Sequence, residues 1–359
     1  MKRIISPEIA ATAENAGQHI LCGLVTLTVA AFLSFVWVLF AAVAQAEEPG
    51  GACSGRDLIQ VYASEAPEKL AEIEAEAAKV PNGEGIFWKI ERDGSEPSYL
   101  FGTMHMADER IARLTRARLE AFNNADTVVV ESVDALDQQK TMAAMMGLQD
   151  LTMLTDGTTL DQKLSPETIA KLQPALEARG MPFAVARMLQ PWVVATAVSV
   201  PVCETLAKHS GEPVLDAVIG RKAQADGKQL VGLETIEEQF AAMASLPAEF
   251  HLGALRETLE LGTVAEDVME TMKQLYMRGE TGMVMPMLKF ATPKTSESGS
   301  YAHFQRQLIE NRNALMAERA LPVLEKGNAF IAVGALHLPG KTGLVQAFRD
   351  AGYTVSRAD

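Results

Sequence analysis

Apolar residues recur with helical spacing along most of the chain. Between residues 57 and 80, Leu58, Leu70 and Ile73 fall on one side of a helical wheel among Glu and Lys, which predicts one amphipathic helix. The same spacing predicts helices through most of the middle of the chain and near its end. The predicted helices are 109–124, 142–154, 165–180, 182–208, 214–225, a helix from about 235 to 245 with further helices up to 278, 301–326 and 343–351, and 292–300 is a predicted surface loop.

Short apolar runs predict strands, and these runs concentrate near the two ends. The run 127–130 is apolar on both faces, which is typical of a strand in a sheet covered on both sides. The sequence therefore predicts an α/β fold, with α+β as an alternative, and a split central sheet formed by βαβ-like repeats at 84–134 and 301–357. The segment 135–300 is a predicted, mainly helical insertion, within a single domain 53–359. The predicted strands are 86–91, 98–103, 127–130, 229–232, 329–333 and 353–355.

A Gly-x-x-His motif follows a predicted strand in both repeats. Gly102 leads to His105 in the first repeat, and Gly334 leads to His337 in the second. Glycine ends a strand without a side chain, so that backbone or ligand can approach closely. Parallel strands in βαβ units end at the same edge of a sheet, where ligands of open α/β sheets bind. The two histidines are therefore predicted to share one site.

Two acids and an arginine are further candidates for this site. Glu131 directly follows the strand 127–130, and Glu234 follows the strand 229–232 after one further apolar residue, Leu233. A carboxylate at the end of a buried strand is unfavourable unless it is paired or bound to a metal. Arg312, in the helix just before the strand 329–333, is able to pair with either acid or to bind a substrate carboxylate or carbonyl. Gln239 is a weaker candidate of the same kind.

The N-terminal segment 1–46 carries the features of an export sequence. Lys2 and Arg3 precede an apolar run over about residues 20–43, and Ala44-Gln45-Ala46 matches a signal-peptidase site. The run is also long enough to span a bilayer, so two interpretations remain: a cleaved signal peptide or an uncleaved N-terminal anchor. Both place the remainder outside the cytoplasm, in the periplasm or anchored in the inner membrane facing the periplasm.

The net charge excludes some classes of partner, and the cysteines bear on the cellular compartment. A formal net charge of -14 argues against nucleic acid and makes anionic membrane surfaces poor targets, apart from the N-terminal segment if it stays uncleaved. Of 3 cysteines, Cys22 lies in the apolar run. Cys53 and Cys203 then form either one disulfide, as in many exported proteins, or two separate buried thiols.

The motif segments together resemble the TraB/GumN family, which includes PrgY-like and Tiki-like proteins. The similarity extends from about Cys53 to the C-terminus and is greatest to the bacterial GumN-like branch. It implies a fold related to erythromycin-esterase-like and haem-binding ChaN-like proteins, and it favours a Cys53–Cys203 disulfide. The segments that carry it are 88–90, 98–105, Glu131, 232–235 with Gln239, Arg312-Asn313 and 333–340.

The resemblance also implies a metal-dependent protease site. Mapped onto this chain, the metal ligands are His105, His337 and Glu131. The positions of the residues themselves make Glu131, Glu234 and Arg312 the candidate catalytic residues. One of the two acids is expected to act as general base, and Arg312 is expected to stabilise an oxyanion. The supporting residues are Gly102, Gly334, Gln239 and Asn313.

The leading hypothesis is therefore an exported metal-dependent hydrolase, peptidase-like, that acts on a peptide or protein. Two imidazoles and a carboxylate suit a divalent ion such as zinc, manganese or cobalt, with positions left open for water. One alternative is a hydrolase that uses His and Glu without a metal on an ester or similar bond. Another is a non-catalytic periplasmic protein that sequesters a peptide, haem or an envelope component.

Overall fold

The computed structural model describes residues 53–291 and 300–359. The predicted signal or anchor, Cys22 and the predicted loop up to residue 299 lie outside these ranges, while Ser300 already belongs to a helix. Within the described ranges, none of the helices combines the length and apolar character needed to cross a membrane.

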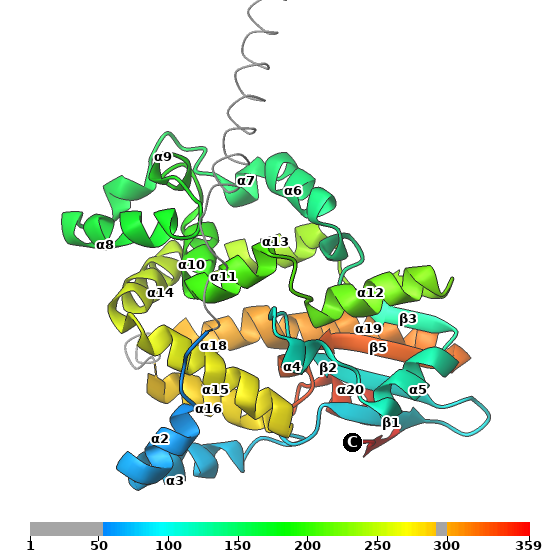
Figure 1. Cartoon of the computed structure of the whole chain (residues 1–359). Helices are drawn as coiled ribbons and strands as arrows, with labels where there is room; N and C mark the ends of the chain where they lie inside the picture. Colours follow the sequence, from blue (N-terminus) through cyan, green and yellow to red (C-terminus); the bar gives the residue numbers. More distant parts are fainter. Residues whose placement is uncertain (1–52, 292–299) are drawn as a thin grey trace, which may run out of the picture. The chain divides into compact units, whose positions relative to one another are not determined.

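The predicted α/β fold is confirmed, with one mixed sheet of six strands in the order β4-β3-β5-β2-β1-β6 (Figure 1). β5, from the end of the chain, pairs in parallel with both β2 and β3, so the two predicted repeats interleave in one sheet. β4 pairs in parallel with β3, whereas β1 is antiparallel to both β2 and β6. The strands are β1 (Phe87–Glu91), β2 (Ser98–Thr103), β3 (Thr127–Val130), β4 (Gln229–Gly232), β5 (Ala329–Gly334) and β6 (Thr354–Arg357).

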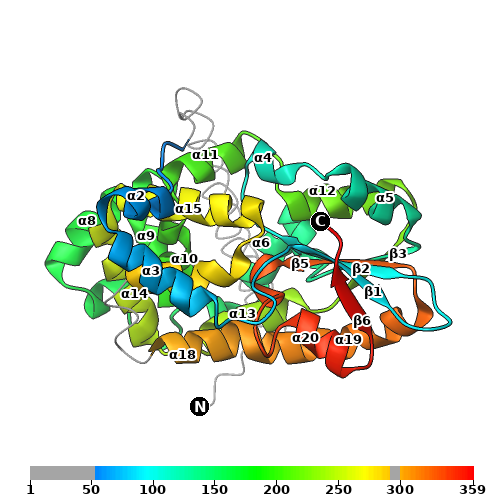
Figure 2. The same ribbon diagram turned by 90° about the horizontal axis from the view of Figure 1, so that it is seen from below.

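Helices cover both faces of the sheet (Figure 2). Phe330 and Ala332 of β5 pack on one face with α5 (Arg116–Asn124) and α12 (Leu215–Ala225). Ile331 and Val333 pack on the other face with α19 (Asn311–Lys326) and α20 (Leu344–Asp350). Successive side chains of a strand point to opposite faces, so both sets are fully apolar and buried.

Two further hydrophobic clusters form between helices: one joins α8, α10 and α14 to one side of the sheet (Figure 1), and the other joins α2, α3, α15 and α16. The short turns of 3-10 or π geometry are labelled η. The elements in chain order are α2 (Leu58–Glu65), α3 (Pro67–Ala77), α4 (Glu109–Ala112), η1 (Asp134–Leu136), α6 (Gln138–Gly147), α7 (Gln149–Thr152), η2 (Leu160–Lys163), α8 (Pro166–Glu177), α9 (Phe183–Ala186), α10 (Pro191–Ser199), α11 (Val202–His209), α13 (Ile236–Ala244), α14 (Ala248–Leu261), α15 (Val264–Arg278), η3 (Thr281–Met283), α16 (Val284–Ala291), α18 (Ser300–Gln305), η4 (Arg306–Glu310) and η5 (Ala335–His337).

Several predicted helices are shorter than the apolar pattern indicated. The predicted helix 57–80 is divided into α2 and α3 at Pro67, and the predicted helix 182–208 is divided at Pro191 and Pro201. Proline lacks an N–H to donate within a helix and is accommodated at the first helical position, where that N–H has no partner. The predicted helix 109–124 also divides, into α4 and α5, because Arg113 is extended.

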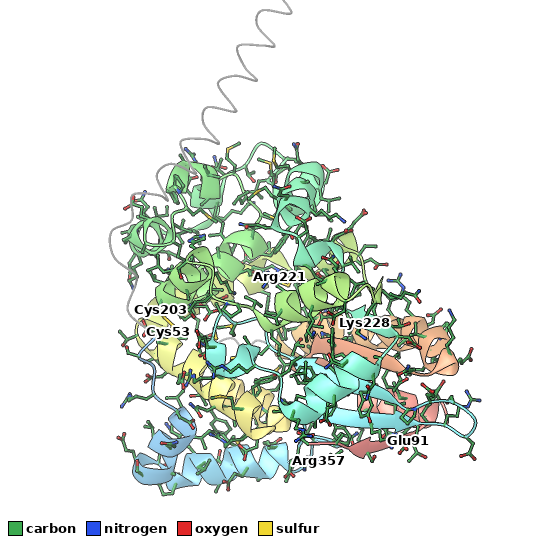
Figure 3. The ribbon with its side chains drawn as sticks, turned by 45° about the vertical axis from the view of Figure 1, so that its right-hand side comes forward. Cys53, Glu91, Cys203, Arg221, Lys228 and Arg357 are labelled. Carbon is green, nitrogen blue, oxygen red and sulfur yellow. A yellow bond between two sulfur atoms is a disulfide. The ribbon has the colours of Figure 1, made fainter. Side chains whose placement is uncertain are left out.

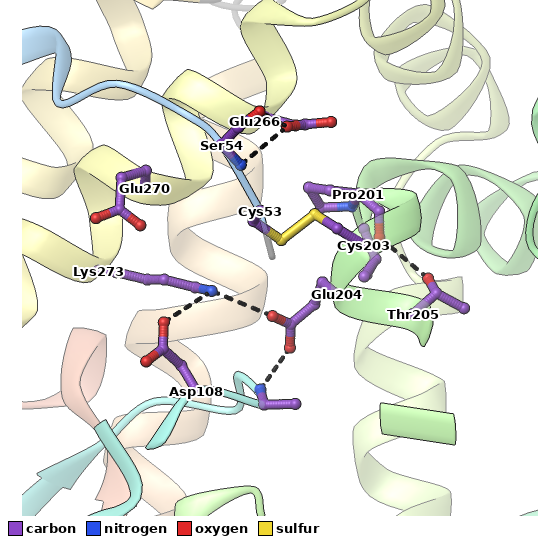
Figure 4. The surroundings of a disulfide bond; sticks show 12 residues. Cys53, Ser54, Asp108, Pro201, Cys203, Glu204, Thr205, Glu266, Glu270 and Lys273 are labelled. Atoms are coloured by element: carbon purple, nitrogen blue, oxygen red, sulfur yellow. Dashed lines mark hydrogen bonds and ion pairs between the residues drawn. A yellow bond between two sulfur atoms is a disulfide. The ribbon is translucent and has the colours of Figure 1, made fainter. Parts of the chain in front are cut away.

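The predicted disulfide is confirmed: Cys53 is bonded to Cys203 at the start of α11 (Figures 3 and 4). The next residue, Glu204, is fully buried and accepts a hydrogen bond from the backbone N–H of Ala107 at 2.5 Å. Its other oxygen lies 3.3 Å from the ammonium of Lys273 on α15. The disulfide therefore fixes a helix whose buried carboxylate holds the loop after β2.

Lys273 links the carboxylates of this cluster. Its side chain is 3% exposed and lies 3.2 Å from Asp108 as well as 3.3 Å from Glu204. We predict that Lys273→Ala lowers the free energy of unfolding by about 1–3 kcal/mol, because it removes the buried cation between the two carboxylates and leaves Asp108 to Arg110 and Glu204 to Lys208, both more exposed. The matched control, Lys171→Ala, removes an exposed partner of Glu167 and should cost about 0.5 kcal/mol or less. Urea denaturation of the oxidised chain measures both, and equal losses would contradict the assignment.

Candidate active site

The ends of β2 and β5 bring the two Gly-x-x-His motifs together. These strands are adjacent and parallel, and Thr103 is in register with Gly334. A Cβ atom on Gly102 would lie 3.0 Å from the Cα of Ala335, so glycine permits the close approach of the two motifs. His105 and His337 consequently follow neighbouring strand ends at one edge of the sheet.

His337 is buried and held in one orientation. Its side chain is 5% exposed, and its Nδ1 lies 2.6 Å from the Oδ1 of Asn313 on α19. The amide nitrogen of Asn313 donates to the carbonyl of Thr342 at 2.8 Å, which leaves Oδ1 as the acceptor. Nδ1 of His337 is therefore the protonated nitrogen, and Nε2 presents a lone pair 3.8 Å from Oε1 of Glu131.

His105 is held by a carboxylate that the sequence did not indicate. Its Nδ1 lies 2.8 Å from Oδ2 of Asp216, near the start of α12. The hydroxyl of Thr103 donates to the other oxygen of Asp216 at 2.6 Å. Nε2 of His105 thus faces Oε1 of Glu131 at 3.9 Å, although the imidazole is 58% exposed.

Glu131 lies between the two imidazoles. Its Oε1 accepts a hydrogen bond from the backbone N–H of Gly334 at 2.5 Å, and its Oε2 accepts from Arg312 at 2.9 Å. A Cβ atom on Gly334 would lie 2.9 Å from Oε1, so the second glycine allows the carboxylate to reach the strand end. Both oxygens of this buried side chain are therefore satisfied by the chain itself.

The remaining predicted residues form a layer behind Glu131. Arg312 donates to both oxygens of Glu234, at 2.9 Å from Nε and 2.6 Å from Nη2. Gln239 donates to Glu131 at 3.3 Å and to Glu234 at 3.4 Å. Arg312 thus bridges two buried carboxylates, and within the described residues Glu234 is linked to Glu131 through Arg312 and Gln239.

The electrostatic environment differs between the two imidazoles. Asp216 and, more weakly, Glu131 raise the pKa of His105 to about 9. Burial lowers the pKa of His337 to about 4, although Glu131 opposes this shift. Burial alone would raise the pKa of Glu131, but His337, His105, Arg312 and the Gly334 N–H together lower it to about 2. The carboxylate is therefore ionised at neutral pH, and His337 is neutral beside it.

A cavity of about 340 Å³ opens directly onto these side chains. His105, Glu131, Arg312 and His337 line it, whereas Glu234 does not. Most of the other lining side chains are apolar, and four of them are methionines from the loop after β2 and from α15. The sequence did not predict this cavity, because its walls come from segments far apart in the chain.

The donor types fit a divalent cation. Two Nε2 atoms and a carboxylate oxygen converge, and each Nδ1 has a hydrogen-bond partner of the kind that orients metal-binding histidines. The Nε2–Oε1 distances of 3.8 and 3.9 Å exceed the separation of about 3.3 Å between two ligands bonded at about 2 Å in a tetrahedral site. In residues 53–291 and 300–359, no three His, Cys, Asp or Glu side chains are close enough to hold an ion as they stand. Binding through these three therefore requires an inward shift, for which the exposed His105 has room.

The family model described as TraB/PrgY/gumN matches residues 86–357, which include both histidine motifs and Glu131. The chain belongs to the TraB/PrgY/gumN family. It is 26% identical over 316 residues to a zebrafish (Danio rerio) protein named Metalloprotease TIKI1, an alignment that covers 75% of this chain and 62% of the relative. Metalloprotease TIKI2 of the same species is 24% identical, with 75% of this chain and 60% of the relative covered. The chain thus spans about three fifths of the length of these two relatives.

A bacterial relative aligns over most of its length. The uncharacterized protein YbaP of Shigella flexneri is 24% identical over 257 residues, which cover 71% of this chain and 89% of the relative. The YbaP protein of Escherichia coli K12 matches with the same identity and the same coverage.

We predict that Asp216→Asn lowers the pKa of His105 from about 9 toward its ordinary value of 6.5, because the largest favourable charge beside the imidazolium is removed. NMR titration of the His105 ring in the chelator-treated chain measures this pKa. Asp226→Asn, at the other end of α12, is the matched control and should leave it unchanged. An unaltered pKa in Asp216→Asn would contradict the role given to Asp216.

The ion pair between His105 and Asp216 predicts a pH dependence of the free energy of unfolding. The pKa of His105 is higher in the folded chain than its ordinary value, so protonation of His105 favours the folded state. This contribution is complete below about pH 6.5 and is lost as the pH rises through about 9. Thermal unfolding of the chelator-treated chain between these pH values should show the loss in the wild type and a smaller loss in Asp216→Asn.

Proposed function

We propose that this protein is an exported, metal-dependent hydrolase that cleaves peptide bonds. The observation that carries the proposal is the convergence of the two Nε2 atoms on one ionised carboxylate at the mouth of a cavity. The neutral imidazole of His337 and the carboxylate of Glu131 present electron pairs toward the same point. A cation placed between them would remove the repulsion between these electron pairs. Two relatives that carry the name metalloprotease support the reaction class.

His105, His337 and Glu131 would hold the ion. A bound divalent ion supplies polarisation of the scissile carbonyl and lowers the pKa of a water molecule. Zinc, manganese and cobalt all accept imidazole and carboxylate ligands. Asp216 and Asn313 would keep the two Nε2 atoms turned toward the ion, and hydrogen-bond partners of metal-binding histidines affect both metal affinity and rate.

The hydrogen bonds indicate different roles for the two acids, Glu131 and Glu234. Glu131 reaches the cavity, so it is the group able to accept a proton from water or to act as the third ligand. Glu234 is 5% exposed and bonded to Arg312, so we assign it a positioning role. Arg312 lines the cavity while it fixes both carboxylates, and it is the cationic group available to a developing oxyanion.

Export is the part of the proposal that rests on the N-terminal segment and the disulfide. A disulfide between Cys53 and Cys203 is consistent with an oxidising compartment such as the periplasm. Residues 1–46, whose composition predicts a signal peptide or an anchor, lie outside the described part of the chain.

We predict that the purified chain binds a divalent ion and hydrolyses peptides, and that His105→Ala/His337→Ala loses both properties. Removal of two of three ligands should reduce the rate of hydrolysis by at least about a hundredfold. Loss of a hydrogen-bond partner of a metal ligand alone lowers metal affinity or activity by about 10–100-fold. Elemental analysis of metal content and mass spectrometry of a peptide library provide the measurements. His209→Ala, an exposed histidine at the end of α11, is the control and should retain both. Equal, negligible metal in the wild type and the double variant would refute the proposal.

A further inference from the structure

We propose that the methionine-lined cavity beside the histidines binds an apolar side chain of a peptide, and that the hydroxyl of Thr281 hydrogen-bonds the peptide backbone. This inference rests on the proposed function, because it names the substrate class of that same site. It assigns binding roles to residues that lie outside the histidine and carboxylate cluster.

The cavity separates into a charged end and an apolar remainder. Its ionisable lining groups at the charged end are His105, Glu131, Arg312 and His337, which lie in contact with one another. The apolar walls come from the loop after β2, from α15, from η4 before α19 and from η5 after β5. Six side chains represent these walls: Met104, Met106, Met269, Met272, Leu308 and Leu336.

The methionines favour a flexible apolar occupant. Thioether side chains are unbranched and polarisable, so they adapt to ligands of different outline. A charged substrate side chain would lose its hydration in this part of the cavity without gaining an ion pair, since the charged lining groups are paired with each other. A volume of about 340 Å³ lies at the lower end of the range for small-ligand pockets, which suits a short peptide segment.

Thr281 is the observation that indicates a peptide rather than a plain hydrocarbon. It lies in η3, lines the cavity and is 2% exposed. Its Oγ1 has no hydrogen-bond partner in the described residues. Buried hydroxyls are nearly always hydrogen-bonded, so an unpaired one on a cavity wall is suited to a polar group of a ligand. A peptide supplies an N–H and a C=O beside each apolar side chain.

The cavity has a second polar contact that is already occupied. The hydroxyl of Tyr276 donates to the carbonyl of Gly102 at 2.9 Å and is buried. It braces the strand end that leads to His105, so it is not available in the same way as Thr281. The hydroxyl of Tyr276 therefore has a structural role, and the hydroxyl of Thr281 is the one assigned to ligand binding.

The binding test uses NMR of methionine methyl groups labelled with ¹³C in the oxidised, chelator-treated chain. The probes are blocked tripeptides, acetyl-Ala-X-Ala-amide, with X as Leu, Met, Glu or Lys. We expect the Met104, Met269 and Met272 resonances to shift with the Leu and Met peptides and not with the Glu and Lys peptides. Met277, which is 38% exposed on the same helix as Met269, is the internal control and should not shift. Absence of shifts with any peptide, or equal shifts with all four, would overturn the inference.

Variants of Thr281 separate binding from folding. Thr281→Val keeps the shape and removes the hydroxyl, so it should weaken binding of the Leu peptide by about three- to tenfold while the melting temperature stays equal or rises. Thr281→Ser should restore binding. If Thr281→Val binds the peptide as tightly as the wild type, the hydroxyl has no role in recognition.

A second pair of variants tests the apolar wall. Met269→Gln should weaken binding of the Leu peptide, and Met277→Gln, on the exposed part of the same helix, should leave it unchanged. Equal binding by both variants would count against the cavity as the site.

The results also distinguish this inference from the proposed function. Selective methionine shifts without any hydrolysis, by a chain reloaded with zinc, manganese or cobalt, would refute the hydrolase and retain the peptide site. Hydrolysis at the same rate for every central residue X of the tripeptides, with no shift of the methionine resonances, would retain the hydrolase and refute the peptide site.

Discussion

The site depends on the burial of one ionised carboxylate. Glu131 is 8% exposed at the end of a strand whose preceding residues are fully apolar. Removing a carboxylate from water is costly unless hydrogen bonds and opposite charge replace the lost hydration. Arg312 and the Gly334 N–H provide that replacement from one side, and the two imidazoles face the carboxylate from the other. The arrangement of the surrounding elements follows from this requirement.

The sheet and the disulfide supply the positions that Glu131 needs. Because β5 lies between β3 and β2, Glu131 emerges on one side of Gly334 and His105 on the other. α12 carries Asp216 to His105, and α19 carries both Arg312 and Asn313 to the opposite side. The bond between Cys53 and Cys203 fixes α11, whose Glu204 accepts from Ala107 in the loop that follows His105. Segments separated by more than a hundred residues therefore meet at one strand edge.

The sequence predicted the parts of this arrangement that leave a local pattern. The boundaries of β2, β3 and β4 follow from short apolar runs, and the two Gly-x-x-His motifs mark the strand ends that meet. Glu131 and Glu234 stand out because an acid follows each apolar run directly. Arg312 was indicated only by its position in the helix before the strand 329–333 and by resemblance, and its bridge between the two acids depends on tertiary packing.

The parts that the sequence did not predict have no local pattern. Asp216 looks like any acid in the first turn of a helix, and its contact with His105 spans 111 positions of the chain. Thr281 and the methionines of α15 have helical spacing that equally describes an ordinary core. The breaks at Pro67, Pro191 and Pro201 were readable in principle, but apolar periodicity continues through them, so the predicted helices were too long.

Binding of Co²⁺ to the chelator-treated chain, followed by its visible absorption, tests most directly whether Glu131 and the two imidazoles form one cation site. The account predicts that the wild type binds a single equivalent with the spectrum of a nitrogen and oxygen site of low coordination number. Glu131→Gln, checked to be folded by its melting temperature, should bind at least about tenfold more weakly and change the spectrum. A wild-type chain that binds no Co²⁺, or a Glu131→Gln chain with the same affinity and spectrum as the wild type, would contradict it.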